Sequence, residues 1–244
     1  MQPTYSDDDV AALYEVLNSW GPGDDFYLGL VMAAASVLDV GCGPGGLLRR
    51  AREEGHRGRL CGVDPDVAAL DRARLRTDVE WVEGRAAGLA AAGEFDLAVM
   101  AGNAFQELRE DAELTASLAA IRRALTTGGR FAFDTRNPEV REWEQWRPEN
   151  GMDVVDHRGR ELRVWHDVEA VADGRVTFTE TTGTREGTAL RVDRGTLRFV
   201  DAARLDGLLA AAGFVVEERY GGWDRRPFAP DSRSIITVAR AVDG

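Results

Sequence analysis

Residues 36 to 135 alternate short apolar runs with longer amphipathic stretches. Buried strands are predicted at the apolar runs 36–40, 59–64, 79–84, 95–100 and 130–134. Apolar residues recur at helical spacing in the segments between them, so helices are predicted at 46–55, 66–76 and 111–129. Strands that alternate with helices indicate parallel βαβ units. The predicted fold class is therefore α/β, with a doubly wound, Rossmann-like sheet.

The pattern changes at residues 136–150, which contain two prolines and two tryptophans. Three strand-like segments follow, ELRVWHDVEAV, RVTFTETTG and TALRVDRGTLRFV, separated by an Asp-Gly turn and by a longer glycine-bounded turn. We expect residues 136–200 to form an inserted antiparallel β subdomain that caps the substrate. A helix at 201–213 and two final strands return to the core. Because no helix separates these two strands, they are predicted to pair antiparallel.

Three segments of the chain are therefore expected to have different roles. Residues 1–35 are predicted to be an N-terminal helical lid, and residues 36–135 with 201–244 form the core around the insertion. The N-terminus is acidic, unlike a secretory signal, and no apolar run is long enough to span a bilayer. We expect a soluble, cytoplasmic protein with no membrane partner. The oligomeric state is not predicted.

Charge and composition exclude several classes of function. The net charge of −12 and the pI of about 4.8 argue against a nucleic-acid partner, since such binding needs a clustered basic face. The chain contains no lysine, which excludes a P-loop and a pyridoxal Schiff base. The two cysteines, Cys42 and Cys61, form no CxxC pair, and no metal is expected.

The glycine turn VLDVGCGPGG follows the first strand of the core. The spacing Gly41-x-Gly43-x-x-Gly46 satisfies the dinucleotide fingerprint, so an NAD-dependent oxidoreductase is one hypothesis. Asp39 argues against it, because a carboxylate directly before the glycines would repel a pyrophosphate. The same carboxylate suits a ligand with an ammonium group. Asp64 ends the second strand at the spacing of about 20 residues that is typical of a ribose-binding acid.

Four blocks occur in the order found in class I S-adenosylmethionine-dependent methyltransferases, and the chain resembles that family. They are VLDVGCGPGG, GVDPD, FDLAVMAGNAFQEL and LTTGGRFAFD. The resemblance implies S-adenosylmethionine (SAM) as methyl donor, S-adenosylhomocysteine (SAH) as product, and a mostly parallel sheet with an antiparallel C-terminal strand. It also implies a small-molecule acceptor that is methylated on nitrogen or oxygen.

The resemblance further implies roles for individual residues. The methionine part of SAM would be held by Asp39, Gly41, Cys42 and Gly43, the ribose by Asp64, and the adenine near Pro65. Relatives often place an acid after the third strand, where this chain has Arg85, so the adenine contact is expected from the backbone of Arg85 and Ala86. Gly102 and Asn103 would lie beside the methyl group. Residues 14–27 resemble the lid of glycine and amino-sugar N-methyltransferases, with three aromatic side chains over the cofactor: Tyr14, Trp20 and Tyr27. The alternative for each is an amphipathic helix that simply packs on the sheet.

Catalytic and substrate residues are less clearly marked in the sequence. Methyl transfer from a sulfonium needs a base only when the acceptor carries a proton that must leave, and no catalytic dyad is evident. His157 and His166 are candidates for a base, and ordinary strand positions are the alternative for both. The candidates for substrate contact are Arg136, Asn137, Trp143 and Trp146. Because Arg85 replaces the usual acid, a non-catalytic SAM-binding module remains a further hypothesis.

Overall fold

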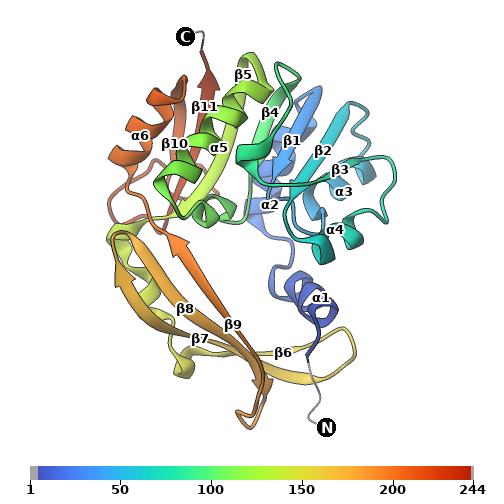
Figure 1. Cartoon of the computed structure of the whole chain (residues 1–244), viewed down its shortest axis with the longest axis vertical. Helices are drawn as coiled ribbons and strands as arrows, with labels where there is room; N and C mark the ends of the chain where they lie inside the picture. Colours follow the sequence, from blue (N-terminus) through green and yellow to red (C-terminus); the bar gives the residue numbers. More distant parts are fainter. Residues whose placement is uncertain (1–4, 243–244) are drawn as a thin grey trace. The chain divides into compact units, whose positions relative to one another are not determined.

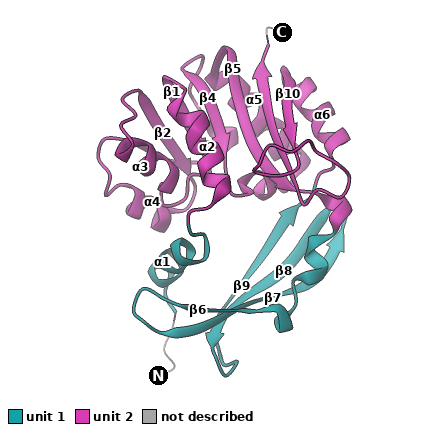
Figure 2. Cartoon of the chain, turned by 180° about the vertical axis from the view of Figure 1, so that it is seen from behind, with its two compact units in different colours: residues 1–19, 141–199 teal, residues 20–140, 200–244 magenta. Residues whose placement is uncertain are grey.

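In the computed structural model, which describes residues 5–242, the chain divides between two units (Figure 2). The core unit consists of residues 20–140 and 200 onward, and the insertion unit consists of residues 141–199 with the N-terminal segment up to residue 19. Each unit has a sheet of its own.

The core unit is built on a seven-stranded sheet with the order β10-β11-β5-β4-β1-β2-β3 (Figure 1). Strands β1 to β5 are parallel, and β11 pairs antiparallel with both β5 and β10. The predicted α/β class and the antiparallel C-terminal strands are confirmed. The strands are β1 (Ser36–Val40), β2 (Arg59–Asp64), β3 (Glu80–Glu83), β4 (Phe95–Met100), β5 (Leu125–Arg136), β10 (Phe214–Tyr220) and β11 (Ser234–Ala241).

Helices cover both faces of this sheet. One face buries α5 and α6 through Leu118 and Leu205, and the other buries α2 and α3 through Phe26 and Leu48. Alternate strand residues point to opposite faces, so each strand supplies both layers of the core. The helices are α2 (Pro22–Met32), α3 (Gly46–Glu53), α4 (Val67–Ala73), α5 (Asp111–Ala124) and α6 (Ala202–Ala211), with the 3₁₀ turns η1 (Ala86–Gly88), η2 (Ala104–Glu107) and η3 (Pro138–Val140).

The end of α5 differs from the sequence prediction of a helix over 111–129. The helix ends at Ala124, and β5 begins at Leu125, which pairs with Phe95 of β4. Leu125 has extended dihedrals, φ −81° and ψ 143°. The helical periodicity of the sequence continues beyond this point, but pairing with a strand about thirty residues earlier overrides it.

The insertion unit contains a four-stranded antiparallel sheet with the order β6-β7-β8-β9. Three of its strands match the prediction, whereas β6 was missed because its four residues are too few to show a period. The strands are β6 (Met152–Val155), β7 (Glu161–Ala172), β8 (Arg175–Thr184) and β9 (Ala189–Arg198), preceded by the 3₁₀ turns η4 (Glu142–Gln145) and η5 (Pro148–Asn150).

Helix α1 (Asp7–Leu17) packs on the insertion sheet, with Leu13 against Leu162 and Val164. Its first turn is held by Asp9, which is 2% exposed and accepts from the Ser6 backbone and from the Arg160 guanidinium at 3.0 Å. Helix α1 belongs to the insertion unit and α2 to the core unit, and a lid formed by residues 1–35 stays a prediction.

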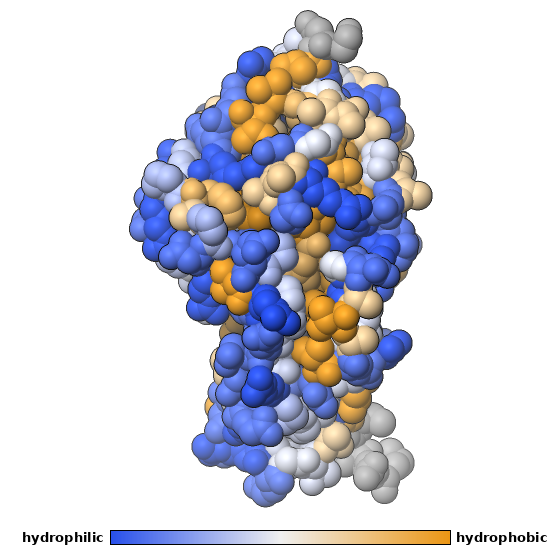
Figure 3. All heavy atoms as spheres, turned by 90° about the vertical axis from the view of Figure 1, so that its left-hand side faces the viewer, coloured by the Kyte–Doolittle hydropathy of each residue, from blue (hydrophilic) through white to orange (hydrophobic). Residues whose placement is uncertain are grey.

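The surface mixes polar and apolar residues. On the face shown in Figure 3, hydrophobic residues form separate patches among hydrophilic ones. Within residues 5–242, no helix combines the length and the apolar character needed to cross a membrane.

Candidate cofactor site

The glycine turn after β1 adopts a backbone that only glycine tolerates well. Gly41, Gly43 and Gly45 have φ values of +78°, +51° and +78°. A Cβ at Gly45 would lie 2.4 Å from the Trp81 ring, whereas a Cβ at Gly43 would meet nothing within 4 Å. Gly45 is thus required for packing under the turn, and Gly43 faces open space where a ligand can approach the backbone.

Asp64 ties the end of β2 to this turn. Its Oδ2 accepts from the Gly43 backbone N–H at 2.7 Å, and its Oδ1 accepts from the Asp66 N–H at 2.8 Å. The side chain is 8% exposed, and its burial raises the pKa. Each carboxylate oxygen keeps one further lone pair, so a held Asp64 can accept from two neighbouring hydroxyls, as a ribose presents.

Asp39 is a buried carboxylate without a hydrogen-bond donor. It is 3% exposed, and no hydrogen bond to it is found within residues 5–242. Burial, with a smaller effect from Asp64, raises its pKa to about 7. An unpaired buried carboxylate is unfavourable, and a ligand that brings a cation or several N–H donors would relieve that cost.

Gly102 and Asn103 form the turn after β4, and both have left-handed backbones, with φ values of 64° and 63°. The Asn103 N–H donates to Asp134 Oδ2 at 3.1 Å, while the buried Asn103 Oδ1 has no hydrogen-bond partner. The sequence interpretation missed Asp134, which is 1% exposed near the end of β5. The sequence feature that could have revealed Asp134 is an acid directly after the apolar residues FAF of this strand.

The three aromatic residues assigned to a lid lie in different settings. Tyr14 is exposed on α1 of the insertion unit, and the half-exposed Trp20 donates from Nε1 to Asp25 at 2.7 Å. Tyr27 differs from the expectation of a lid residue: it is 1% exposed, and its hydroxyl donates to Asp134 at 2.6 Å. Its ring is part of the core under α2, where burial fixes it in place.

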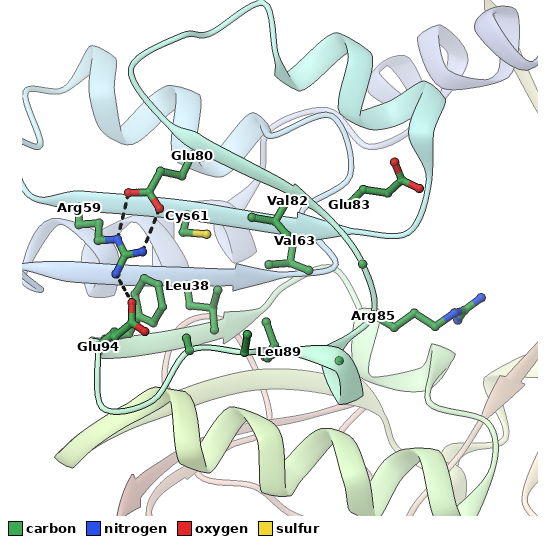
Figure 4. A pocket seen from close by; sticks show the side chains of 15 residues that line it. Leu38, Arg59, Cys61, Val63, Glu80, Val82, Glu83, Arg85, Leu89 and Glu94 are labelled. Carbon is green, nitrogen blue, oxygen red and sulfur yellow. Dashed lines mark hydrogen bonds and ion pairs between the residues drawn. The ribbon is translucent and has the colours of Figure 1, made fainter.

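A pocket of about 320 Å³ lies beside β3 and the segment that follows it (Figure 4). Leu38, Cys61 and Leu89 supply apolar walls, and Arg59 bridges Glu80 and Glu94 at one end. These residues lie on β1, β2, β3 and on the segment that precedes β4.

Arg85 points away from the other residues of this pocket (Figure 4). Its guanidinium is 67% exposed and lies 3.5 Å from Glu113. Ala86 is buried beside it, whereas Pro65 at the end of β2 is exposed. The positive charge of Arg85 therefore does not lie in the space next to the backbone of residues 84–86. Cys42 in the glycine turn is buried, and burial raises the pKa of its thiol, so it is a packing residue.

The two substrate candidates at the end of β5, Arg136 as its last residue and Asn137 directly after it, make contacts within the core unit. Arg136 Nη1 donates to Gln106 at 2.8 Å. Asn137 is 1% exposed, and its amide donates to the carbonyls of Pro230 and Ser232, both at 2.8 Å. The Asn137 amide thus closes the loop between β10 and β11, and its contact with a substrate stays a prediction.

The remaining candidates lie in the insertion unit. Trp143 packs on Phe199 with ring centroids 4.6 Å apart, and Trp146 packs on Phe178 at 5.0 Å. His166 Nε2 lies 2.8 Å from Glu180 Oε2, and this partner was not foreseen from the sequence. The signal was available only in three dimensions, because the two residues face each other across β7 and β8.

His157 lies in the turn between β6 and β7 and has basic neighbours. Its Nε2 accepts from Arg158 Nε at 3.2 Å and lies 3.9 Å from Asp9. His157 therefore faces arginine, whereas the His166 ring faces the Glu180 carboxylate. Within residues 5–242, no group of three or more potential metal ligands is arranged to hold an ion.

Known proteins share this architecture. The solved CcbJ methyltransferase from Streptomyces caelestis superposes with a TM-score of 0.76 at 20% identity, over 98% of this chain and 100% of that chain. SAM-bound CalS10, an amino pentose methyltransferase from Micromonospora echinaspora, has a TM-score of 0.70 at 22% identity, over 94% of this chain and 97% of that chain. The chain thus shares the Rossmann-like fold of these solved proteins.

Sequence comparison assigns the segment that carries the site. Residues 37–129 match the family described as "Methyltransferase domain". The chain is also 33% identical over 148 residues to the cypemycin N-terminal methyltransferase of a Streptomyces species, a match that covers 56% of this chain and 58% of that protein. The chain therefore spans little more than half of that relative's length.

Proposed function

We propose that this protein is a SAM-dependent methyltransferase that transfers a methyl group to nitrogen or oxygen of a small molecule. The observation that carries the proposal is Asp39, a buried carboxylate without a donor directly before an open glycine turn. The methionine part of SAM has the ammonium group that this carboxylate needs. A dinucleotide would instead place a pyrophosphate there, and two anions would repel each other.

Each part of the candidate site has a counterpart in SAM. Asp39 would pair with the ammonium group, the backbone of Gly41 and Gly43 would line the methionine part, and Asp64 would accept from both ribose hydroxyls. When bound, SAM supplies a methyl group that is already activated by its sulfonium. The protein then has to align the acceptor in line with the S–CH₃ bond and exclude water from it.

An acceptor amine or hydroxyl must also lose a proton, and we propose His166 as the base. Glu180 favours the proton on Nε2 of the ring, because a carboxylate only accepts, so Nδ1 is left with its lone pair. Asp39 and Asp64 would hold SAM so that its activated methyl group could pass to the acceptor atom, and Nδ1 of His166 would take the proton that the acceptor loses. The product SAH is a neutral thioether at sulfur.

The names of related proteins support amines as the acceptor class. CalS10 is named as an amino pentose methyltransferase and the cypemycin enzyme as an N-terminal methyltransferase, so amines come first in an acceptor screen. We propose that Trp146 and the insertion unit contribute to recognising the acceptor, and that the protein works in the cytoplasm without a metal ion.

Isothermal titration calorimetry of the cofactor-stripped protein tests the donor. We expect micromolar binding of SAM and SAH and no binding of NADH. Folded protein that binds neither sulfur compound would contradict the proposal, and NADH binding alone would favour an oxidoreductase.

An acceptor screen with methyl-labelled SAM then tests the reaction, and the matched His166→Gln and His157→Gln variants test the base. Only His166→Gln should lower the turnover of an acceptor whose amine or hydroxyl must lose a proton.

A further inference from the structure

We infer that Tyr27 and Asp134 are positioning residues for the methyl-donor site, because they hold the Gly102–Asn103 turn against the glycine turn. The inference rests on the function proposed above and deepens it. No sequence motif assigns either residue this role. We call Tyr27, Asp134, Gly102 and Asn103 the Asp134 cluster.

The Asp134 carboxylate joins three segments of the core unit. Its Oδ1 accepts from the Tyr27 hydroxyl of α2 at 2.6 Å, and its Oδ2 accepts from the Asn103 backbone N–H at 3.1 Å. Burial raises the pKa of Asp134 and the Gly102 backbone lowers it, which shows that this backbone lies close to the carboxylate. The side chains of Tyr27 and Asp134 are both 1% exposed, so these hydrogen bonds are shielded from water and are stronger than surface hydrogen bonds of the same length.

The turn that Asp134 holds has an uncommon conformation. Gly102 and Asn103 are consecutive residues with left-handed φ values, 64° and 63°. Asparagine tolerates this region better than most residues, yet it is still disfavoured relative to the extended or helical regions. A buried carboxylate that accepts from the Asn103 backbone N–H stabilises this arrangement, because it satisfies that N–H in the left-handed conformation.

The turn is in direct contact with the glycine turn. A Cβ added to Gly41 would lie 2.9 Å from the Ala104 Cβ, so residue 104 packs against the Gly41 backbone with no space between them. A shift of residues 102–104 would therefore displace Gly41, which lies two residues after Asp39. This is the end of the site proposed for the methionine part of SAM and is distinct from the ribose end at Asp64.

Asn103 itself supplies a second observation that points to a ligand. Its buried Oδ1 has no hydrogen-bond partner, although nearly all buried polar atoms have one. The cluster thus fixes the backbone of a residue whose side chain retains a free acceptor. A donor group on the methionine part of SAM, or on the acceptor molecule, would satisfy it.

Binding measurements with three variants test the inference. Asp134→Ala removes the anchor, and Tyr27→Phe removes one bond to it. Asp134→Asn keeps the geometry, since its carbonyl oxygen can face Asn103 and its NH₂ can donate to the Tyr27 oxygen. Tyr220→Phe is the matched control, because it removes a phenol–carboxylate bond of the same length, 2.6 Å to Glu218, elsewhere in the core unit.

Calorimetry would compare SAH with 5′-methylthioadenosine, which has the same nucleoside but lacks the amino-acid part. We expect Asp134→Ala to weaken SAH binding by about ten- to hundredfold and Tyr27→Phe by about threefold, while Asp134→Asn and Tyr220→Phe stay within about twofold. Binding of 5′-methylthioadenosine should change by less than about twofold in every variant, which also shows that each variant is folded.

Three results would overturn the inference. Unchanged SAH binding in both Tyr27→Phe and Asp134→Ala would mean that the cluster does not position the site. Equal losses for SAH and 5′-methylthioadenosine would indicate a general structural role. If Asp134→Asn lost as much SAH affinity as Asp134→Ala, the charge of Asp134 would matter for binding and its positioning of the turn would not. Wild-type protein that binds no SAH would instead contradict the proposed function itself.

Discussion

At the scale of single residues, Asp39 links ligand binding to pH. Its pKa of about 7 in the folded protein lies above the ordinary value of 3.8, because the carboxylate is buried. Because the folded state favours the neutral carboxyl, Asp39 stabilises the folded protein at low pH, and this contribution is lost as the pH rises through 7. A bound ammonium group would reverse this, since it favours the charged form.

Asp39→Asn therefore has opposite effects with and without ligand. Without ligand, the variant should be more stable than wild type, and the difference should grow by about 2–3 kcal/mol between pH 5 and pH 8. Urea unfolding at the two pH values measures this. With ligand, the variant should bind SAM more weakly at pH 8. A stability difference that does not change with pH would show that Asp39 is already ionised without cost.

Asp64 carries a prediction of the same scale. Asp64→Ala should weaken SAM binding by about tenfold or more, because the ribose hydroxyls lose a charged acceptor and the Gly43 N–H loses its partner. The neighbouring Asp66→Ala is the control: Asp66 caps α4 by accepting from Ala68 and Ala69, so its loss should lower stability and leave affinity unchanged. Equal affinities for wild type and Asp64→Ala would refute the ribose assignment.

At the scale of elements, close packing of β2 against β3 requires a glycine. A Cβ at Gly62 would lie 2.5 Å from the Trp81 ring and 2.8 Å from Cys42 Sγ. Gly62→Ala should therefore destabilise the protein by about 1–3 kcal/mol.

Gly29→Ala is the matched control for Gly62→Ala. It lies in the middle of α2, and its Cβ would meet nothing within 4 Å, so the change should stabilise by about 0.5–1 kcal/mol. Thermal unfolding separates the two variants. Similar melting temperatures would show that Trp81 moves aside without cost.

Strands were predicted more accurately than the ends of helices. The apolar runs at 36–40, 59–64 and 95–100 became strands with the same bounds, because a buried parallel strand needs only a local run of apolar residues. The end of α5 was misplaced, because Leu125 leaves the helix to pair with Phe95, a residue remote in sequence.

At the scale of the whole molecule, the proposed SAM residues and helix α1 belong to different units. Asp9→Ala removes the carboxylate that Arg158 and Arg160 contact at 3.2 Å and 3.0 Å, so α1 should be held less firmly. We expect faster hydrogen exchange of the α1 amides and SAM affinity within about twofold of wild type. A larger loss of affinity would show that Tyr14, on the same helix, contributes to the cofactor site.

The sequence alone determined the class of the fold, the glycine turn and its two acids. Each of these depends on neighbours within one strand and one turn, so periodicity and residue type are enough to reveal it. The tertiary structure decided the rest. It buried Tyr27 on Asp134, turned Asn137 to the loop between β10 and β11, and set Glu180 opposite His166. Each of those partners lies 14 to 107 residues away along the chain, and a polar side chain takes its role from the group it meets, which no local pattern specifies.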